Sequence, residues 1–325
     1  MKQERIIIDC DPGHDDAVAL FMALGAPDAF DVIGVTTVSG NAAVELTQDN
    51  ARLICALAGR PDIPVYVGCS RPMVRGQFDA TEFHGKSGLD GLHVRGALGR
   101  VLSARRIHAI DFLIESLTGS DGPVTLVCLA PLTNIAMALV KEPAIAANIK
   151  EIVFMGGARR AGGNVSPCAT FNVLCDPHAA HVVMESGCPL TVLSLDATSK
   201  VVVSDRLLED VAALRSDVAR ATHQMLTFFN RRRIEVYGYT PDQATLNDPC
   251  VIAYLLDRTL FSGRDANIAI SLDSGLTLGM TVVDLAGRSG RAPNALWIDD
   301  ANGDGVHHVL LDILDRYEPL PHESA

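Results

Sequence analysis

The stretch IIIDCDPGHDD, residues 6–16, decides the fold. It begins as an uninterrupted run of β-branched apolar residues, which is typical of a strand buried on both faces. Pro12 and Gly13 end the strand, and residues 15–24 continue with helical spacing. Ligands of parallel α/β sheets bind at the carboxyl ends of the strands, so we expect the carboxylates of this turn at a ligand-binding edge.

The same alternation of strand and helix patterns continues over the first 200 residues. Strands are predicted at 6–8, 32–38, 64–67, 124–129, 152–155 and 190–195. Helices are predicted at 15–24, 44–58, 109–117, 133–140 and 177–185. This order predicts an α/β protein with a Rossmann-like open, mostly parallel sheet that is flanked by helices.

Beyond Ser204 the pattern becomes mainly helical. Helices are predicted at 205–214, 218–236, 249–256 and 306–317, and strand-like runs at 267–272 and 276–283. No linker or repeat divides the chain, so we expect one domain over residues 1–325 with a helical C-terminal portion. The segment 300–305 resembles the start of an EF-hand loop, but Leu311 stands where that loop needs a bidentate Glu, so we interpret it as a turn and helix cap.

Composition and charge exclude several classes of function. The chain has 325 residues, 48% of them hydrophobic, and a net charge of −12, which disfavours nucleic acid and anionic membranes as partners. No run approaches the roughly 18 apolar residues of a membrane span, and the N-terminus lacks the apolar segment of a signal peptide. Eight cysteines without C-x-x-C pairs indicate mostly buried thiols and a cytoplasmic location.

The acidic turn predicts a metal site. Asp9, Asp11, Asp15 and Asp16 fall within eight residues, and two like charges about 4 Å apart repel by about 4 kcal/mol at the effective dielectric of a protein surface. A hard divalent cation, Ca²⁺ or Mg²⁺, offsets such repulsion with oxygen ligands alone. The simpler interpretation is that Asp15 and Asp16 cap the helix while Asp9 makes structural hydrogen bonds. Asp248 is a further candidate ligand of the metal ion, although by itself an Asp before Pro249 is typical of a helix cap.

These residues also resemble a known family. Asp9–Asp16 closely resembles the N-terminal signature of the nucleoside hydrolases, the inosine/uridine-preferring type of N-ribohydrolase. The resemblance continues in order along the chain, from residue 5 to about residue 284. Its further motifs are TTVSGN (36–41), HGKSG (84–88), PLTNIA (131–136), MGG (155–157), GN (163–164), FN (171–172), DP (176–177), NDP (247–249) and LTLGMT (276–281).

The resemblance implies a Ca²⁺-dependent nucleosidase that hydrolyses the N-glycosidic bond of ribonucleosides. In the family's pattern Asp11 is the general base toward a metal-bound water. The reaction passes through an oxocarbenium-like ribosyl cation, which explains the negative potential of the site. The implied ligands of the Ca²⁺ ion are Asp11, Asp16, Asp248 and the backbone carbonyl of Leu129, and the implied contacts to the sugar come from Asp15, Asn41, Met155, Asn164 and Asn172.

Two positions depart from the family's pattern. Asn247 stands where the best-studied branch has a His that serves as a plausible acid for the departing base, and an Asn side chain has no proton to transfer. His84 is a substitute candidate for that catalytic role, and a histidine that only orders its loop is the alternative. Thr170 replaces a Glu that contacts the 5′ end of the sugar, so recognition of the 5′ group stays open.

Other interpretations remain open from the sequence. A strand that ends in D-x-D also begins the haloacid-dehalogenase-type phosphatases, where Asp9 would be the nucleophile. A nucleoside-binding protein that has lost turnover through Asn247 and Thr170 is a second alternative. The segment 228–237 resembles a helical region of the family that often supplies aromatic residues over the base, which makes Phe229 and Tyr237 candidates. An amphipathic helix with a solvated basic face is the simpler interpretation. The family commonly forms homodimers or homotetramers.

Overall fold

A nine-stranded sheet runs through the protein, with strand order β3-β2-β1-β4-β5-β6-β9-β7-β8. The structure is a computed structural model that describes residues 3–77, 84–93, 105–120, 122–240 and 243–318. The strands are β1 (Glu4–Cys10), β2 (Phe30–Thr37), β3 (Val65–Val67), β4 (Val124–Cys128), β5 (Ile149–Met155), β6 (Leu190–Leu193), β7 (Phe261–Ile270), β8 (Thr281–Asp284) and β9 (Ala295–Ala301).

The first six strands and β9 pair in parallel, which confirms the predicted Rossmann-like arrangement. β7 lies antiparallel to β9, and β8 antiparallel to β7, so the far edge of the sheet is mixed. β1 lies between β2 and β4 and is buried almost throughout, as its apolar run predicted. The carboxyl ends of the parallel strands therefore point to one edge of the sheet.

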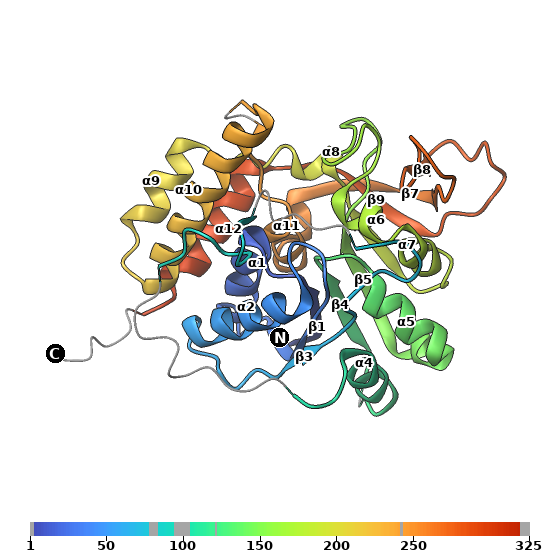
Figure 1. Ribbon diagram of the computed structural model, residues 1–325, viewed down its shortest axis with the longest axis horizontal. Helices are drawn as coiled ribbons and strands as arrows, with labels where there is room; N and C mark the ends of the chain where they lie inside the picture. The colour runs from blue at the N-terminus through green and yellow to red at the C-terminus, as the bar shows by residue number, and fades with distance from the viewer. Residues whose placement is uncertain (1–2, 78–83, 94–104, 121, 241–242, 319–325) are drawn as a thin grey trace.

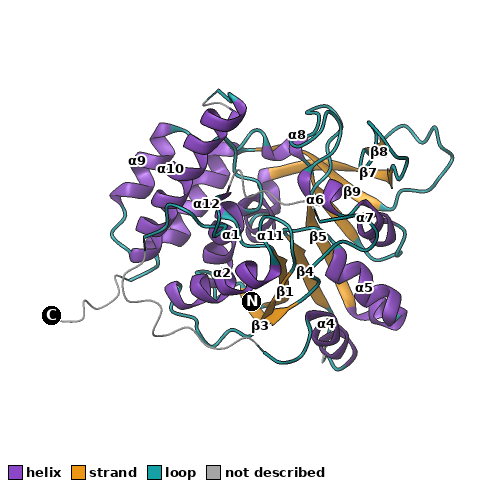
Figure 2. Ribbon diagram, in the orientation of Figure 1, coloured by secondary structure: helices purple, strands orange, loops and turns teal. Residues whose placement is uncertain are grey.

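Helices cover both faces of the sheet (Figures 1 and 2). One face packs against α1 (His14–Leu24), α2 (Val44–Leu57), α9 (Asp205–Ala213), α10 (Asp217–Tyr237), α11 (Pro249–Leu256) and α12 (Gly303–Asp315). The other face packs against α4 (Ala109–Thr118), α5 (Thr133–Lys141) and α7 (Pro177–Met184). Short helical segments complete the described chain: α6 (Phe171–Cys175), α8 (Leu195–Thr198), η2 (Pro143–Asn148) and η4 (Arg258–Leu260).

The C-terminal third differs from the prediction in its strands. β9 was not predicted, yet it lies inside the sheet beside β6 and carries the fully buried Trp297. The strand predicted at 267–272 begins earlier, at Phe261, and most of the segment predicted at 276–283 is a turn that precedes β8. The helix cap predicted after residue 300 is confirmed, because the Asn302 side chain accepts a hydrogen bond from the backbone N–H of Gly305.

None of the helices in the described ranges combines the length and the apolar composition needed to cross a bilayer. All eight cysteines are free thiols, and six of them are buried, which agrees with the prediction of mostly buried thiols.

Asn134, at the start of α5, ties three strand ends together. Its Nδ2 donates to Asp9 Oδ1 at 2.8 Å and to the Thr37 carbonyl at 3.0 Å, and its Oδ1 accepts from the Cys69 N–H at 2.9 Å. Thr36 Oγ1 donates to the same Asp9 oxygen at 2.6 Å. The bonds to Asp9 and to the Thr37 carbonyl are buried, so they fix the sheet edge at which the acidic turn begins.

Asn134→Ala should destabilise the protein, because it leaves several buried polar groups without partners. We expect the free energy of unfolding to fall by about 2–4 kcal/mol. Urea unfolding at equilibrium measures this change. Lys141→Ala, at the exposed end of the same helix, is the matched control, since the surface ion pair of Lys141 with Asp111 contributes less than about 1 kcal/mol. A similar loss in both variants would contradict the role given to Asn134.

Candidate active site

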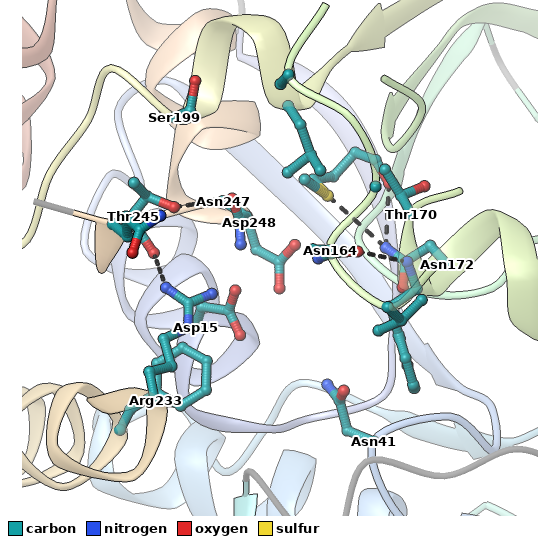
Figure 3. A pocket seen from close by; sticks show the side chains of 18 of the residues that line it. Asp15, Asn41, Asn164, Thr170, Asn172, Ser199, Arg233, Thr245, Asn247 and Asp248 are labelled. Atoms are coloured by element: carbon teal, nitrogen blue, oxygen red, sulfur yellow. Dashed lines mark hydrogen bonds between the residues drawn. The ribbon is translucent and has the colours of Figure 1, made fainter. Parts of the chain in front are cut away.

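A cavity of about 320 Å³ opens at the carboxyl edge of the sheet. Asp11 lies in the turn between β1 and α1, and Asp16 lies in the first turn of α1, beside the residues that line the cavity. Figure 3 shows Asn164 and Asn172 on one side of the cavity, Thr245, Asn247 and Arg233 on the other, and Asp248 between them. Ten of the twelve residues predicted from sequence line this cavity: Asp15, Asn41, His84, Leu129, Met155, Asn164, Thr170, Asn172, Asn247 and Asp248.

The acidic turn is held in place by its own backbone. Asp16 Oδ1 accepts from the N–H of Asp11 at 3.1 Å, and Oδ2 accepts from the N–H of Gly13 at 3.2 Å. Asp16 therefore caps α1, as the simpler interpretation predicted, and the helix dipole favours its charge. Asp9 makes the structural hydrogen bonds expected of it, and burial raises its pKa to about 7.

The loop after β2 closes over this turn. The N–H of Asn41 donates to Asp11 Oδ2 at 2.6 Å, and the Asn41 Nδ2 donates to Asp16 Oδ2 at 3.0 Å. Gly40 permits this approach, because a Cβ atom at that position would overlap the Asp11 carboxylate. Asn41 thus bridges the two carboxylates, while its predicted contact with the sugar stays a prediction.

Four buried carboxylates meet at the cavity, and two of them, Asp15 and Asp248, line it. One oxygen each from Asp15, Asp16 and Asp248 lies within 4.8 Å of the other two. Burial, and then repulsion from Asp15, raises the pKa of Asp16 to about 7. Burial followed by repulsion from Asp15, Asp16 and Asp11 raises the pKa of Asp248 well above its ordinary value, and burial and Asp16 do the same for Asp11.

This donor set fits a hard divalent cation. The cluster consists of carboxylate oxygens, the ligand type that Ca²⁺ and Mg²⁺ take. Burial and mutual repulsion raise the pKa of Asp248, and a bound cation would offset both effects. The Leu129 carbonyl faces the same cavity and accepts from Asn172 Nδ2 at 2.6 Å, which leaves it a second lone pair. The three-residue cluster contains Asp15 in place of the predicted Asp11. The choice between these ligand sets stays a prediction.

Amide side chains form the wall near β5 and α6. Asn172 also donates to the Met155 carbonyl at 3.0 Å, and Asn164 Oδ1 accepts from the N–H of Phe171 at 2.8 Å. Thr170 Oγ1 accepts from the N–H of Gly157 at 3.0 Å, so one of its lone pairs already serves the fold. This wall presents neutral hydrogen-bonding groups of the kind that bind sugar hydroxyls.

Asn247 lies on the opposite wall and is fixed on both sides of its amide. Its Oδ1 accepts from Thr198 Oγ1 at 2.9 Å. Its side chain also hydrogen bonds to Asp15, an interaction that lowers the pKa of Asp15 against the larger effect of burial. Asn247 therefore positions Asp15.

His84 lines the cavity and stacks between neighbouring rings. Its Nδ1 accepts from the N–H of His14 at 3.2 Å, and its ring centroid lies 4.9 Å from that of Phe229. Burial is the main cause that lowers the pKa of His84 well below its ordinary value, so the ring is neutral at pH 7. A neutral imidazole donates a hydrogen bond but has no spare proton to transfer. His14 is a buried supporting residue, as expected, and its Nε2 contacts the Asp90 carbonyl at 2.9 Å.

The sequence interpretation missed Arg233. Residues 231–233 read as one basic run on a solvated face, yet Arg233 is only 7% exposed and lines the cavity. The signal was its spacing, because Arg233 follows Phe229 by four residues on the buried side of α10. Phe229, the other candidate on this helix, also lines the cavity, whereas the side chain of Tyr237 lies outside the described part of the chain.

Fold and site together define a Rossmann-like α/β protein whose buried acidic cluster meets a polar cavity at the carboxyl edge of the parallel strands. The family model of the inosine-uridine preferring nucleoside hydrolases matches residues 6–308. The chain belongs to this family, whose members are enzymes that hydrolyse the N-glycosidic bond of ribonucleosides. The phosphatase alternative, with Asp9 as nucleophile, is therefore wrong.

Relatives and solved structures agree with this assignment. The chain is 40% identical to a pyrimidine-specific ribonucleoside hydrolase RihA of Shewanella sp. (strain ANA-3), over 97% of each chain. It superposes on the plant nucleoside hydrolase PpNRh1 with a TM-score of 0.87 and 30% identity, covering 97% of this chain and 99% of that one. For the purine-preferring ribonucleoside hydrolase of Gardnerella vaginalis the TM-score is 0.86 at 27% identity, covering 96% and 99%.

Removal of divalent cations should make stability depend on pH in a defined direction. Asp16 has a folded-state pKa of about 7 against its ordinary 3.8, so it favours the folded chain below pH 3.8 and loses that contribution as the pH rises through about 7. We expect the melting temperature of the chelated protein to fall over this interval. Added Ca²⁺ should restore it, and most strongly at the higher pH. A melting temperature insensitive to Ca²⁺ above pH 7 would contradict a cation site here.

Proposed function

We propose that the protein is a Ca²⁺-dependent ribonucleoside hydrolase that prefers pyrimidine nucleosides and uses Asp11 as its general base. The observation that carries the proposal is the buried carboxylate cluster, because it faces a cavity lined by neutral amides. Preference for pyrimidines is supported by the name of the RihA relative, to which the chain is similar over almost its full length.

The residues of the site fall into two groups, those that would hold the ion and those that bind the sugar. Asp16, Asp248 and the Leu129 carbonyl would hold the ion with Asp11, and the bound ion supplies positive charge that orients the ribose hydroxyls and eases deprotonation of water. Asp15, Asn164 and Asn172 bind those hydroxyls, with Asn41 and Met155 beside them. Thr170 lies toward the 5′ end of the sugar, and Asn247 holds Asp15 in position.

Asp11 is suited to receive the proton of the attacking water. Its Oδ2 is fixed by the N–H of Asn41 at 2.6 Å, which orients the carboxylate before substrate arrives. Burial and Asp16 raise the pKa of Asp11, which makes it a stronger base than an exposed aspartate once a cation balances the cluster. The carboxylates also favour the positive charge that develops on the ribosyl group.

A substrate panel tests the activity. Purified protein is incubated with uridine, cytidine, inosine, adenosine and guanosine, with and without a chelator, and released reducing sugar is measured. We expect the greatest kcat/KM for the two pyrimidine nucleosides, loss of activity with the chelator, and recovery with Ca²⁺. 2′-Deoxyuridine should react more slowly than uridine, because it offers one hydroxyl fewer to the site. No ribose release from any nucleoside would overturn the proposal.

Asp11→Asn tests the general base. We expect kcat for uridine to fall by a factor on the order of 1,000, with little change in the fold because the amide keeps the shape of the carboxylate. Asp28→Asn, an exposed position, is the matched control and should leave kcat unchanged. Steady-state kinetics of both variants at saturating Ca²⁺ give the comparison, and undiminished turnover by the Asp11 variant would refute the assignment.

We also propose a cytoplasmic location and a homodimeric or homotetrameric assembly. The free, mostly buried thiols support a reducing compartment. Light scattering after size-exclusion chromatography measures the assembly directly.

A further inference from the structure

Arg233 brings a buried positive charge to the cavity. The side chain is only 7% exposed, and its guanidinium lies 4.3 Å from the ring centroid of Phe229. Its Nη1 donates to the Thr245 carbonyl at 2.9 Å. Figure 3 shows the guanidinium close to Asp15, on the side of the cavity opposite Asn164 and Asn172.

Most of the hydrogen-bonding capacity of Arg233 is unused in the described part of the chain. A guanidinium has five N–H donors, and here the Thr245 carbonyl takes one of them. Asp15, Tyr239 and Asp248 interact with it through charge. A buried cation with unpaired donors is costly to the fold, so this arrangement points to a ligand that supplies acceptor atoms.

The position of Arg233 identifies the part of the substrate that it meets. The amides that suit a ribose line the β5–α6 wall, whereas Phe229 and Arg233 face them from α10 with Gln243 and Thr245 alongside. An aromatic ring and a guanidinium suit a flat heterocycle with carbonyl oxygens. The base of the nucleoside therefore lies against α10.

Hydrolysis creates negative charge on that base. Water adds to C1′ and its proton passes to Asp11, while the C1′–N bond breaks and its electron pair leaves with the base. In a pyrimidine this charge is shared with the carbonyl oxygen next to the glycosidic nitrogen, and the base later takes a proton from solvent. In a purine nucleoside the glycosidic nitrogen is N9 of the five-membered ring, and neither of the two ring carbons bonded to N9 carries a carbonyl oxygen.

We propose that Arg233 hydrogen bonds to this carbonyl oxygen of a departing pyrimidine and stabilises the negative charge, in place of an acid that protonates the base. The inference rests on the proposed hydrolysis of ribonucleosides and names the group that serves its leaving base. It accounts for Asn247 at a position where an acid is missing, and for a His84 ring that is neutral. It also gives a physical reason for pyrimidine preference.

The test compares two leaving groups that differ in how much stabilisation their negative charge requires. Uridine requires stabilisation of its base, whereas 4-nitrophenyl β-D-ribofuranoside releases an anion that is stable without it. In Arg233→Met we expect kcat for uridine to fall on the order of 100-fold, while kcat for the nitrophenyl riboside changes by less than about tenfold. Arg233→Lys keeps the charge and should lose less on uridine.

Arg231→Met is the matched control, because Arg231 lies on the same helix and its side chain is 64% exposed. It should react with both substrates as the wild type does. Thermal unfolding of every variant checks the fold. Equal losses on both substrates in Arg233→Met would overturn the proposal, because Arg233 would then act through Asp15 or the fold. Undiminished turnover of uridine by this variant would also overturn it.

Binding of the products gives a readout that does not depend on turnover. Calorimetry should show that Arg233→Met binds free uracil about tenfold or more weakly than the wild type, with affinity for ribose unchanged. Equal affinity for uracil in the two proteins would overturn the proposal. Absence of ribose release by the wild type would overturn the proposed function instead, and the uracil measurement would still decide the role of Arg233.

Discussion

Repulsion among four buried carboxylates is the constraint on which the rest of the structure depends. Asp11, Asp15, Asp16 and Asp248 are each at most 7% exposed, and each has its pKa raised by burial. A fold tolerates such a cluster only if other groups offset the repulsion and the cost of burying the charges. Backbone N–H groups of the β1–α1 turn, the Asn41 amide and the Arg233 guanidinium each offset part of the charge, and a divalent cation would offset the remainder.

The parallel sheet explains why these groups meet. β1, β2, β4 and β5 end at one edge, so Asn41, Leu129 and Met155 line the same cavity from the ends of β2, β4 and β5. Asp11, which follows β1, lies beside it. Polar residues near this edge hydrogen bond to more than one strand, as Asn134 does to β1 and β2. Buried hydrogen bonds therefore hold the acidic end of the site in place, while another wall of the cavity comes from α10 and the segment that follows it.

Sequence predicted the sheet well wherever a strand is buried on both faces, because such strands are continuous apolar runs. β9 escaped prediction since Trp297 is followed by Asp299 and Asp300, whose charges read as a loop, although its pairing with β6 and β7 holds it in the sheet. Ten of the twelve predicted site residues line one cavity because the motifs follow strand ends. Arg233 was missed because a run of three arginines is typical of a solvent-exposed helix face. Only the packing of α10 in the structure shows that one of the three faces inward.

The spacing of the acidic cluster along the chain has a consequence for biosynthesis. Asp11 and Asp16 leave the ribosome early, but Asp248 at the start of α11 and Arg233 on α10 follow more than 200 residues later. During most of translation the nascent chain therefore carries an acidic turn that lacks its distant partners. The cavity can close only when α10 and α11 pack beside α1, so partial chains have no complete site and cannot act on nucleosides before synthesis nears its end.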